Sequence, residues 1–292
     1  MPGAFHETLT RSALITVGHK LREAVLSARY SGRTVGLVPT MGALHEGHLS
    51  LLDAARAECD ATVVTIFVNR TQFGPEEDFR RYPRDLERDL ALLRQRGCDL
   101  VFAPSSEEMY GPQHATFVDV GQLGRVLEGE FRPTHFRGVA TVVLKLFLLV
   151  PADRAYFGRK DYQQTLVVRQ LVADLNVPIE VRVCPIVREA DGLAMSSRNA
   201  YLSEAERQRA LALPRSLRLA EELVASGERD ATVIRQRIGR EMDVAGGIEV
   251  QYIAFVADGT VNPVERIEGP TTIAIAAKVG KTRLIDNKLV GR

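Results

Sequence analysis

Residues 35–48, VGLVPTMGALHEGH, read as the end of a strand, a turn and the start of a helix. The apolar, β-branched character of Thr34–Val38 predicts a buried strand, and Pro39 is expected to end it because proline has no N–H to donate to a ladder. Gly42 and Gly47 allow the backbone to bend and to approach a ligand closely. A strand that leads through such a turn into a helix presents unsatisfied N–H groups and a positive dipole, typically to a phosphate.

Two histidines, His45 and His48, stand where that phosphate would lie. An imidazole at this place donates a hydrogen bond to an α-phosphate oxygen or to a leaving pyrophosphate. The spacing H-x-x-H is a weak signal by itself, and it is not the H-E-x-x-H of zinc hydrolases. The alternative is that these histidines only cap the helix or lie on the surface.

Apolar runs alternate with amphipathic segments through residues 1–185, which predicts an α/β fold with a doubly wound, Rossmann-like parallel sheet. The expected strands are Thr34–Val38, Ala61–Val68, Asp99–Ala103, Arg154–Phe157 and Ile179–Val183, with further short strands possible within 1–16 and at Thr116–Val120. The expected helices are Val17–Tyr30, His48–Glu58, Pro83–Arg96, Val139–Leu149 and Tyr162–Leu175, and Glu128–Gly138 is expected to be a charged loop. Ligands of such sheets bind outside the carboxyl ends of the strands.

The composition changes near Pro185, so residues 186–292 are expected to form a smaller C-terminal α+β domain that acts as a lid. Its first feature is a capping box, Ser203 with Glu206, that predicts the start of a long helix. A second helix over Ala231–Met242 is followed by expected strands at Glu249–Val256, Thr271–Ala277 and Arg283–Ile285.

Charge and composition exclude several classes of protein. The net charge of +1 gives no long-range field for nucleic acid or for an anionic membrane. The longest apolar run, Val139–Val150, is interrupted by Lys145 and is far shorter than the ~20 residues that span a bilayer. The three cysteines are scattered and the N-terminus lacks the pattern of a signal peptide, so we expect a cytoplasmic protein without disulfides.

Several motifs together resemble one family. VPTMGALHEGHLSLL is similar to the signature of the pantoate–β-alanine ligase (pantothenate synthetase) family, and HEGH is similar to the HIGH element of the wider nucleotidylyltransferase and class I aminoacyl-tRNA synthetase superfamily. The motifs that follow in family order are TIFVNRTQFG, EDFRRYPRDLERD, LEGEFRPTHFRGVATVVLKLF, AYFGRKDYQQ and READGLAMSSRN. The resemblance implies condensation of pantoate with β-alanine by MgATP, through a pantoyl adenylate, in a homodimer.

The resemblance also implies a set of site residues. The implied ATP-binding residues are Met41, Gly42, Ala43, Leu44, His45, Glu46, Gly47, His48, Gly158, Arg159, Lys160, Asp161, Val187, Met195, Ser196, Ser197 and Arg198. Those with an implied catalytic role are His45, His48, Lys160 and Arg198, and those implied to bind pantoate or β-alanine are Pro39, Thr40, Gln72 and Gln164. Gln164 is preferred to Gln163, whose side chain is turned about 100° away on a helix.

The residue types agree with these roles, although each has an ordinary structural alternative. Lys160 is a point charge suited to phosphate, whereas Asp161 equally fits a helix cap. Hydroxyls and one guanidinium in residues 195–198 suit a clamp for the β- and γ-phosphates, but such triplets are common in loops. Asp89 is a candidate magnesium ligand, since magnesium is usually coordinated by substrate phosphates, water and only one or two carboxylates.

Two further points follow from the same motifs. Arg132, His135 and Arg137 form a basic loop that is either a secondary part of the site or a solvated face. Arg70 and Arg159 depart from the family, in which proline and an acidic residue are usual at these positions. Two other functions share the nucleotide motifs: a nucleotidylyltransferase that stops at an adenylated product, and a nucleotide-binding regulator without turnover.

Overall fold

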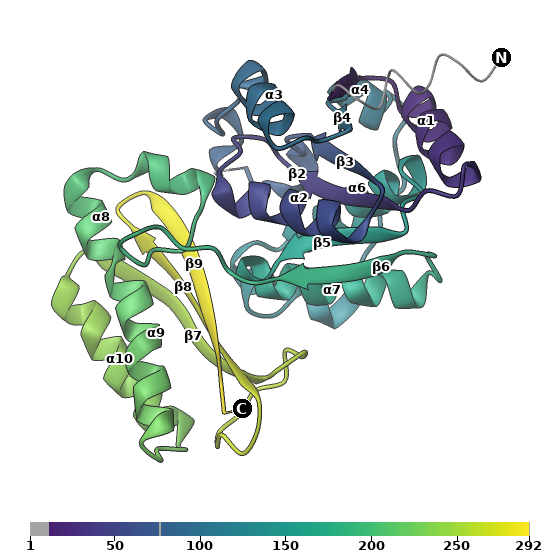
Figure 1. Ribbon diagram of the computed structural model, residues 1–292. Coiled ribbons are helices and arrows are strands. Elements are labelled where there is room, and N and C mark those ends of the chain that lie inside the picture. The colour runs from purple at the N-terminus through teal and green to yellow at the C-terminus, as the bar shows by residue number, and fades with distance from the viewer. Residues whose placement is uncertain (1–11, 76, 292) are drawn as a thin grey trace. The chain divides into compact units, whose positions relative to one another are not determined.

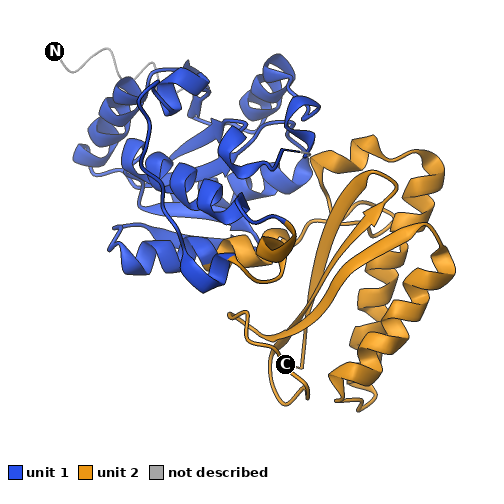
Figure 2. Ribbon diagram, turned by 180° about the vertical axis from the view of Figure 1, so that it is seen from behind, with its two compact units in different colours: residues 1–124, 132–159, 167–185 blue, residues 125–131, 160–166, 186–292 orange. Residues whose placement is uncertain are grey.

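The computed structural model describes residues 12–75 and 77–291 of the chain (Figure 1). The chain divides into two compact units (Figure 2). Unit 1 comprises Met1–Gly124, Arg132–Arg159 and Val167–Pro185, and unit 2 comprises Arg125–Phe131, Lys160–Leu166 and Ile186–Arg292. The main break therefore falls after Pro185, while two short segments from earlier in the chain group with unit 2.

Unit 1 is built on a six-stranded sheet in the order β1-β4-β3-β2-β5-β6, and every neighbouring pair is parallel. Its strands are β1 (Ala13–Ile15), β2 (Val35–Thr40), β3 (Ala61–Ile66), β4 (Leu100–Phe102), β5 (Arg154–Gly158) and β6 (Glu180–Cys184). Its helices are α1 (Gly18–Tyr30), α2 (Glu46–Glu58), α3 (Leu86–Gln95), α4 (Ser106–Met109) and α6 (His135–Leu149), and α7 (Tyr162–Asp174) begins in unit 2 and ends in unit 1. The predicted doubly wound parallel sheet is confirmed.

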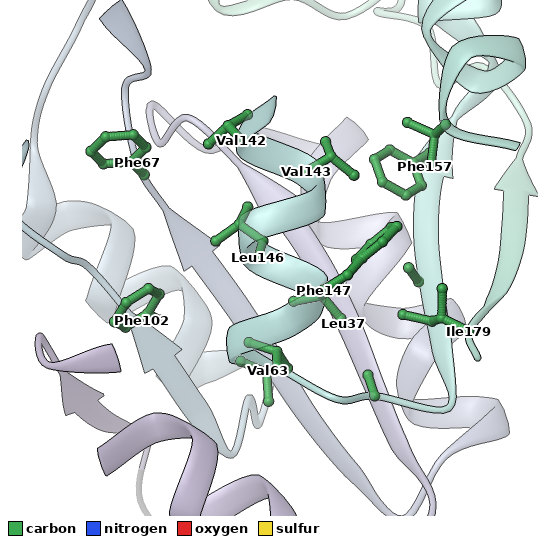
Figure 3. Packing of buried hydrophobic residues seen from close by; sticks show 14 of the residues in the cluster. Leu37, Val63, Phe67, Phe102, Val142, Val143, Leu146, Phe147, Phe157 and Ile179 are labelled. Carbon is green, nitrogen blue, oxygen red and sulfur yellow. The ribbon is translucent and has the colours of Figure 1, made fainter. Parts of the chain in front are cut away.

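Helices cover both faces of this sheet because alternate residues of each strand point to opposite sides. One face carries Leu37, Val63 and Phe157, which pack with α6 through Val143 and Phe147 (Figure 3). The other face carries a second buried set, which packs with α2 and α3. Its members on the strands are Val38, Val64, Val101 and Tyr156. Burial on both faces explains why the strands of the sequence read as continuous apolar runs.

Pro39 does not end its strand as expected. β2 continues to Thr40, and Pro39 is in register with Thr65 of β3. Pairing of β2 with β5 stops earlier, at Leu37. The missing N–H of Pro39 is therefore tolerated, because beyond Leu37 the strand has a partner on one side only.

Two expectations around α6 were also wrong. The predicted strand at Thr116–Val120 is absent from the described residues, because the Val118 N–H donates to Thr141 Oγ1 of α6 at 3.0 Å instead of joining a sheet. The predicted loop over Glu128–Gly138 contains the short helix α5 (Glu128–Phe131) and the first turn of α6. The charged residues and Pro133 of this stretch hide the apolar pattern that marks a core helix, although Phe136 of that turn is buried in the core of unit 1.

Unit 2 contains a three-stranded antiparallel sheet in the order β7-β8-β9, as expected for an α+β domain. Its strands are β7 (Ile248–Ala257), β8 (Thr271–Val279) and β9 (Thr282–Val290), and its main helices are α8 (Glu204–Ala210), α9 (Ala212–Ala225) and α10 (Ala231–Ala245). A separate apolar core, which includes Leu217, Ile238 and Ile275, joins helices and strands. Within the described part of the chain, no helix is long and apolar enough to cross a membrane.

The long helix predicted from Ser203 is divided into α8 and α9. The capping box is confirmed, since Ser203 accepts from the Glu206 N–H and the Glu206 side chain accepts from the Ser203 N–H. In a single helix, the ring of Pro214 would clash with the carbonyl of Ala210. Because α9 restarts at Ala212, Pro214 lies in its first turn, where proline is tolerated.

Candidate active site

The strand order of unit 1 reverses between β2 and β5. In open α/β sheets, ligands bind at this point, outside the carboxyl ends of the strands. The residues that directly follow β2 are Met41 to His45, and those that follow β5 begin at Arg159. The topology therefore places the most distinctive motif of the sequence at the expected binding edge of the sheet.

The turn after β2 has an unusual backbone that is held by a buried carboxylate. Gly42 has φ +79°, and Ala43 has φ +50°, a region that residues other than glycine rarely adopt. Asp89 of α3 is 1% exposed, and its two oxygens accept the N–H groups of Ala43 and Leu44 at 2.8 Å each. Desolvation raises the pKa of Asp89, against the effect of these two N–H donors. Asp89 thus fixes the path by which the chain enters α2.

His45 and His48 come together at the start of α2. The helix begins at Glu46, earlier than predicted, and His45 is its N-cap, with Nδ1 accepting the Gly47 N–H at 3.1 Å. A neutral His45 consequently carries its proton on Nε2. The ring centroids of His45 and His48 lie 4.1 Å apart. Capping and a phosphate-facing role are therefore compatible in one residue, because the cap uses only one ring nitrogen.

Gln72, a predicted pantoate ligand, lies in the 3-10 turn η2 (Arg70–Gln72) after β3 and is 7% exposed. Its Oε1 accepts from Asn69 Nδ2 at 3.1 Å, and its Nε2 lies 3.1 Å from Met41 Sδ. Asn69 is itself held by the hydroxyl of Tyr110, which donates to Oδ1 at 2.9 Å. Sequence reasoning missed Asn69 and Tyr110. The position of Asn69 directly after an apolar strand was the available signal for the first, and Tyr110 had none.

The basic loop supports the backbone of Gln72. Arg132 makes two hydrogen bonds to the carboxylate of Glu77, at 2.9 Å and 2.5 Å, and its Nη1 lies 3.2 Å from His135 Nε2. His135 Nδ1 lies 2.9 Å from the carbonyl oxygen of Gln72. Arg137 does not join this group, since its guanidinium stacks 4.1 Å from the ring of Phe117.

β5 ends at Gly158, where a Cβ would meet no atom within 4 Å. The 3-10 turn η5 (Arg159–Asp161) follows, and Lys160 Nζ lies 3.6 Å from Asp161 Oδ1. Arg159 is half-buried. An open approach at Gly158 beside a lysine suits an anionic ligand.

The two adjacent glutamines of α7 differ in burial and in contacts. Gln163 is buried, and its amide accepts from the Glu128 N–H at 3.0 Å and donates to the Val126 carbonyl at 2.8 Å. Gln163 therefore holds the segment around α5 to α7. Gln164 is half-buried, and its role as a substrate ligand stays a prediction.

In unit 2, residues 186–201 form a tight hairpin and a 3-10 turn, η6 (Ser197–Tyr201). The Met195 N–H donates to the Val187 carbonyl at 3.0 Å, and Ser196 Oγ accepts the Arg198 N–H at 3.3 Å. Asn199 Nδ2 donates to Glu189 Oε1 at 2.6 Å. These bonds fix the backbone on both sides of the predicted phosphate clamp.

A salt-bridge cluster that sequence reasoning missed holds the same hairpin. Arg207 of α8 contacts the carboxylates of Glu189 and Asp191, the latter at 2.7 Å. Burial alone would raise the pKa of Asp191, but the Leu193 N–H and the Arg207 guanidinium bring that pKa below its usual value. Charged residues several positions from a motif give no sequence signal of such a contact.

The carboxylates, histidines and cysteines of the described chain do not gather into a metal site. Within residues 12–75 and 77–291, no group of three or more His, Cys, Asp or Glu side chains is placed to hold a metal ion. Asp89, the predicted magnesium ligand, uses both oxygens to accept backbone N–H groups.

Comparison with known proteins agrees with these features. The family model for pantoate–β-alanine ligase matches residues 13–289. The pantothenate synthetase of Moorella thermoacetica is 54% identical over 267 residues, which cover 91% of this chain and 94% of the relative. That of Thermotoga neapolitana is 54% identical over 263 residues, covering 90% and 94%.

Solved structures similar to this chain belong to the same family. The crystal structure of pantothenate synthetase from Thermus thermophilus matches with a TM-score of 0.90 and 46% identity, covering 94% of this chain and 98% of that one. The pantoate–β-alanine ligase of Francisella tularensis, complexed with beta-gamma ATP and β-alanine, matches with a TM-score of 0.77 and 33% identity over 94% and 97% of the two chains. This chain therefore belongs to the pantoate–β-alanine ligase family, whose reaction is the ATP-dependent condensation of pantoate with β-alanine.

Proposed function

We propose that this enzyme condenses pantoate with β-alanine in two steps. The pantoate carboxylate attacks the α-phosphorus of MgATP, which forms pantoyl adenylate and releases pyrophosphate. The amine of β-alanine then attacks the acyl carbon, the amide bond forms, and AMP leaves with the electrons of the broken acyl–oxygen bond. The observation that carries this proposal is the pair of histidine rings, 4.1 Å apart, at the start of α2 where the strand order reverses.

The histidines and the dipole of α2 would together stabilise the negative charge that develops in the first step. The imidazoles of His45 and His48, at the positive end of the α2 dipole, would donate to phosphate oxygens as charge moves onto pyrophosphate, whereas the Gly47 N–H is already bonded to His45 Nδ1. The mechanism needs positioning and charge neutralisation, and no covalent nucleophile. Burial raises the pKa of Cys98 to about 12, so this thiol is not a nucleophile at neutral pH.

Pantoate binding is assigned to Gln72 and Gln164, together with Pro39 and Thr40 at the end of β2. Asn69 orients the side-chain amide of Gln72, and His135 contacts the backbone carbonyl of Gln72. A carboxamide offers both a donor and an acceptor, which suits a hydroxy acid.

ATP binding is assigned to the turn after β2, to Gly158–Asp161 and to the hairpin of unit 2. Lys160 and Ser196–Arg198 would contact the phosphates, and the Val187 backbone would face the adenine. We propose that magnesium arrives with ATP and takes most of its ligands from phosphates and water. Asp89 would reach the ion only through the second lone pairs of oxygens that already accept N–H groups.

The organisation of the enzyme belongs to the same proposal. Residues 1–185 would supply the ATP- and pantoate-binding domain and residues 186–292 a lid, in a homodimer. Cys59, Cys98 and Cys184 are free thiols, which supports a cytoplasmic location.

Product analysis with and without β-alanine tests the proposed reaction. With ATP, magnesium and pantoate alone, we expect pyrophosphate equal to the enzyme concentration and almost no AMP. Adding β-alanine should give continuous formation of AMP and pantothenate. Multiple turnovers of pyrophosphate without β-alanine would indicate a nucleotidylyltransferase, and no product in either case would indicate a nucleotide-binding regulator.

A further inference from the structure

Two adjacent polar residues, Asp286 and Asn287, are buried in β9, at 3% and 2% exposure. Burial of a carboxylate and an amide is costly unless each has partners. They are linked to one another, because the Asn287 N–H donates to Asp286 Oδ1 at 2.7 Å. Their other partners lie in two segments that the proposed function assigns to ATP.

Asp286 holds the hairpin that leads to the phosphate clamp. Arg188 donates two hydrogen bonds to its carboxylate, from Nη1 at 2.7 Å and from Nη2 at 3.0 Å. Arg188 Nη1 also donates to the Gly192 carbonyl at 3.1 Å across the hairpin. A bidentate pair of this kind fixes orientation as well as distance.

Asn287 holds the segment of the candidate catalytic lysine. Its Nδ2 donates to the backbone carbonyl of Lys160 at 3.0 Å. A second anchor of this segment lies two residues later, where the Tyr162 hydroxyl accepts the Gly259 N–H at 2.9 Å. All of these residues belong to unit 2.

We propose that Asp286 and Asn287 are positioning residues of the ATP site. Neighbouring side chains of one strand fix both the backbone of Lys160 and the hairpin before Ser196–Arg198, so β9 sets the spacing between the lysine and the clamp. Preorganised charge lowers the barrier only when its position is held to well under an ångström. This inference rests on the proposed function of Lys160.

A double-mutant cycle with Lys160 tests the proposal. Asn287→Leu removes the amide and keeps the volume, and it should lower kcat/KM for ATP about tenfold in pantoate-dependent pyrophosphate exchange. In the Lys160→Ala background, the same change should have less than a twofold effect, because there is no ammonium left to position. Asp286→Asn should also lower kcat/KM for ATP, by a separate route through Arg188.

Controls separate positioning from folding. Thr271→Val alters another buried polar side chain of the same sheet, in β8, and should leave exchange unchanged. If Asn287→Leu does not fold, Asn287→Ser replaces it in the cycle. Equal losses from Asn287→Leu with and without Lys160, or unchanged kcat/KM with a lower Tm, would overturn the inference. No effect of Lys160→Ala itself would instead refute the proposed role of Lys160.

Discussion

At the scale of single residues, the position of a candidate site residue was predictable where that residue follows a strand. His45 and His48 were predicted from their place after β2, and they meet with ring centroids 4.1 Å apart. The supporting residues were not predictable, because Tyr110 reaches Asn69 from a position 41 residues away in the chain. Sequence pattern reports periodicity and local turns, whereas such contacts depend on packing.

Removal of a proposed phosphate-facing group should affect catalysis much more than folding. We expect His48→Ala and Lys160→Ala each to lower kcat/KM by roughly 10²–10³, as for loss of one transition-state donor. Steady-state AMP formation measures this, and circular dichroism checks the fold. His19→Ala and Lys278→Ala are matched controls outside the proposed site. Near wild-type turnover in either test variant would show that the role given to that residue is wrong.

Asp89→Asn should affect the turn after β2, and with it catalysis, more than it affects global stability. Asparagine keeps one acceptor but places an NH₂ against the second of the two N–H donors, Ala43 and Leu44. Loss of one such bond costs about 1.5–3 kcal/mol, and relief of the buried charge offsets part of it. We therefore expect a change in Tm of only a few degrees and a loss of kcat/KM of about tenfold.

The dependence on magnesium decides between the two roles of Asp89. If Asp89 acts through the turn, its variant should show an unchanged half-saturating magnesium concentration at saturating ATP. A large increase in that concentration with normal kcat would show that Asp89 is mainly a metal ligand.

At the scale of elements, periodicity predicted most helices and strands and failed at four identifiable places, one of them the strand expected at Thr116–Val120, whose Val118 N–H donates to Thr141 of α6. Pro39 stays in β2 because the pairing of that strand with β5 has already ended. Pro214 divides a predicted helix in two. The first turn of α6 was predicted to be a loop because residues 128–138 are charged and contain proline, yet Phe136 is buried in the core of unit 1. In each case the structure is decided by a tertiary contact or by a helix break, and periodicity reports neither.

The contact of α6 with η2 should be sensitive to one methyl group. A Cβ on Gly138 would lie 2.5 Å from the backbone nitrogen of Gln72. Gly138→Ala must therefore push the helix away from η2, the proposed pantoate-binding turn, and overpacking of this kind costs about 1–3 kcal/mol. We expect a lower Tm together with a raised KM for pantoate.

A second helical glycine provides the control for that change. At Gly239 of α10, the nearest atom to a Cβ is Ile253 Cδ1 at 3.9 Å. Gly239→Ala should raise stability by about 0.5–1 kcal/mol and leave KM unchanged. If Gly138→Ala behaves like Gly239→Ala, then α6 does not position Gln72.

At the scale of the whole molecule, the grouping of residues 125–131 and 160–166 with unit 2 was not predictable. It depends on contacts such as the two hydrogen bonds from Arg283 to the Glu128 carboxylate, both 2.6 Å long, between residues 155 apart. The Tyr252 hydroxyl donates to the same carboxylate at 2.7 Å. The boundary near Pro185 had a sequence signal, whereas these contacts had none.

Ionisation of the buried Tyr252 should lower the stability of unit 2 at alkaline pH. Desolvation and the neighbouring Glu128 carboxylate raise the pKa of Tyr252 well above its ordinary value. The pKa of Tyr252 in the folded state exceeds the unfolded value of about 10. The contribution of protonated Tyr252 to the free energy of unfolding is therefore complete below pH 10 and is lost as pH rises through the folded pKa. Tyr252→Phe should flatten the fall of the free energy of unfolding above pH 10.

Denaturant titrations at several pH values measure that effect. Tyr30→Phe, at a tyrosine that is 86% exposed, should leave the alkaline slope unchanged. An identical slope in wild type and Tyr252→Phe would show that Tyr252 ionises equally in both states, and that its environment differs from the one described.

The central claim is that pantoyl adenylate forms at this site before β-alanine takes part. Exchange of labelled pyrophosphate into ATP measures that step most directly, in the presence of enzyme, magnesium, ATP and pantoate and without β-alanine. We predict exchange that requires pantoate and falls roughly 10²–10³ in His48→Ala. Full ligase activity in the same preparation with no pantoate-dependent exchange would contradict the claim.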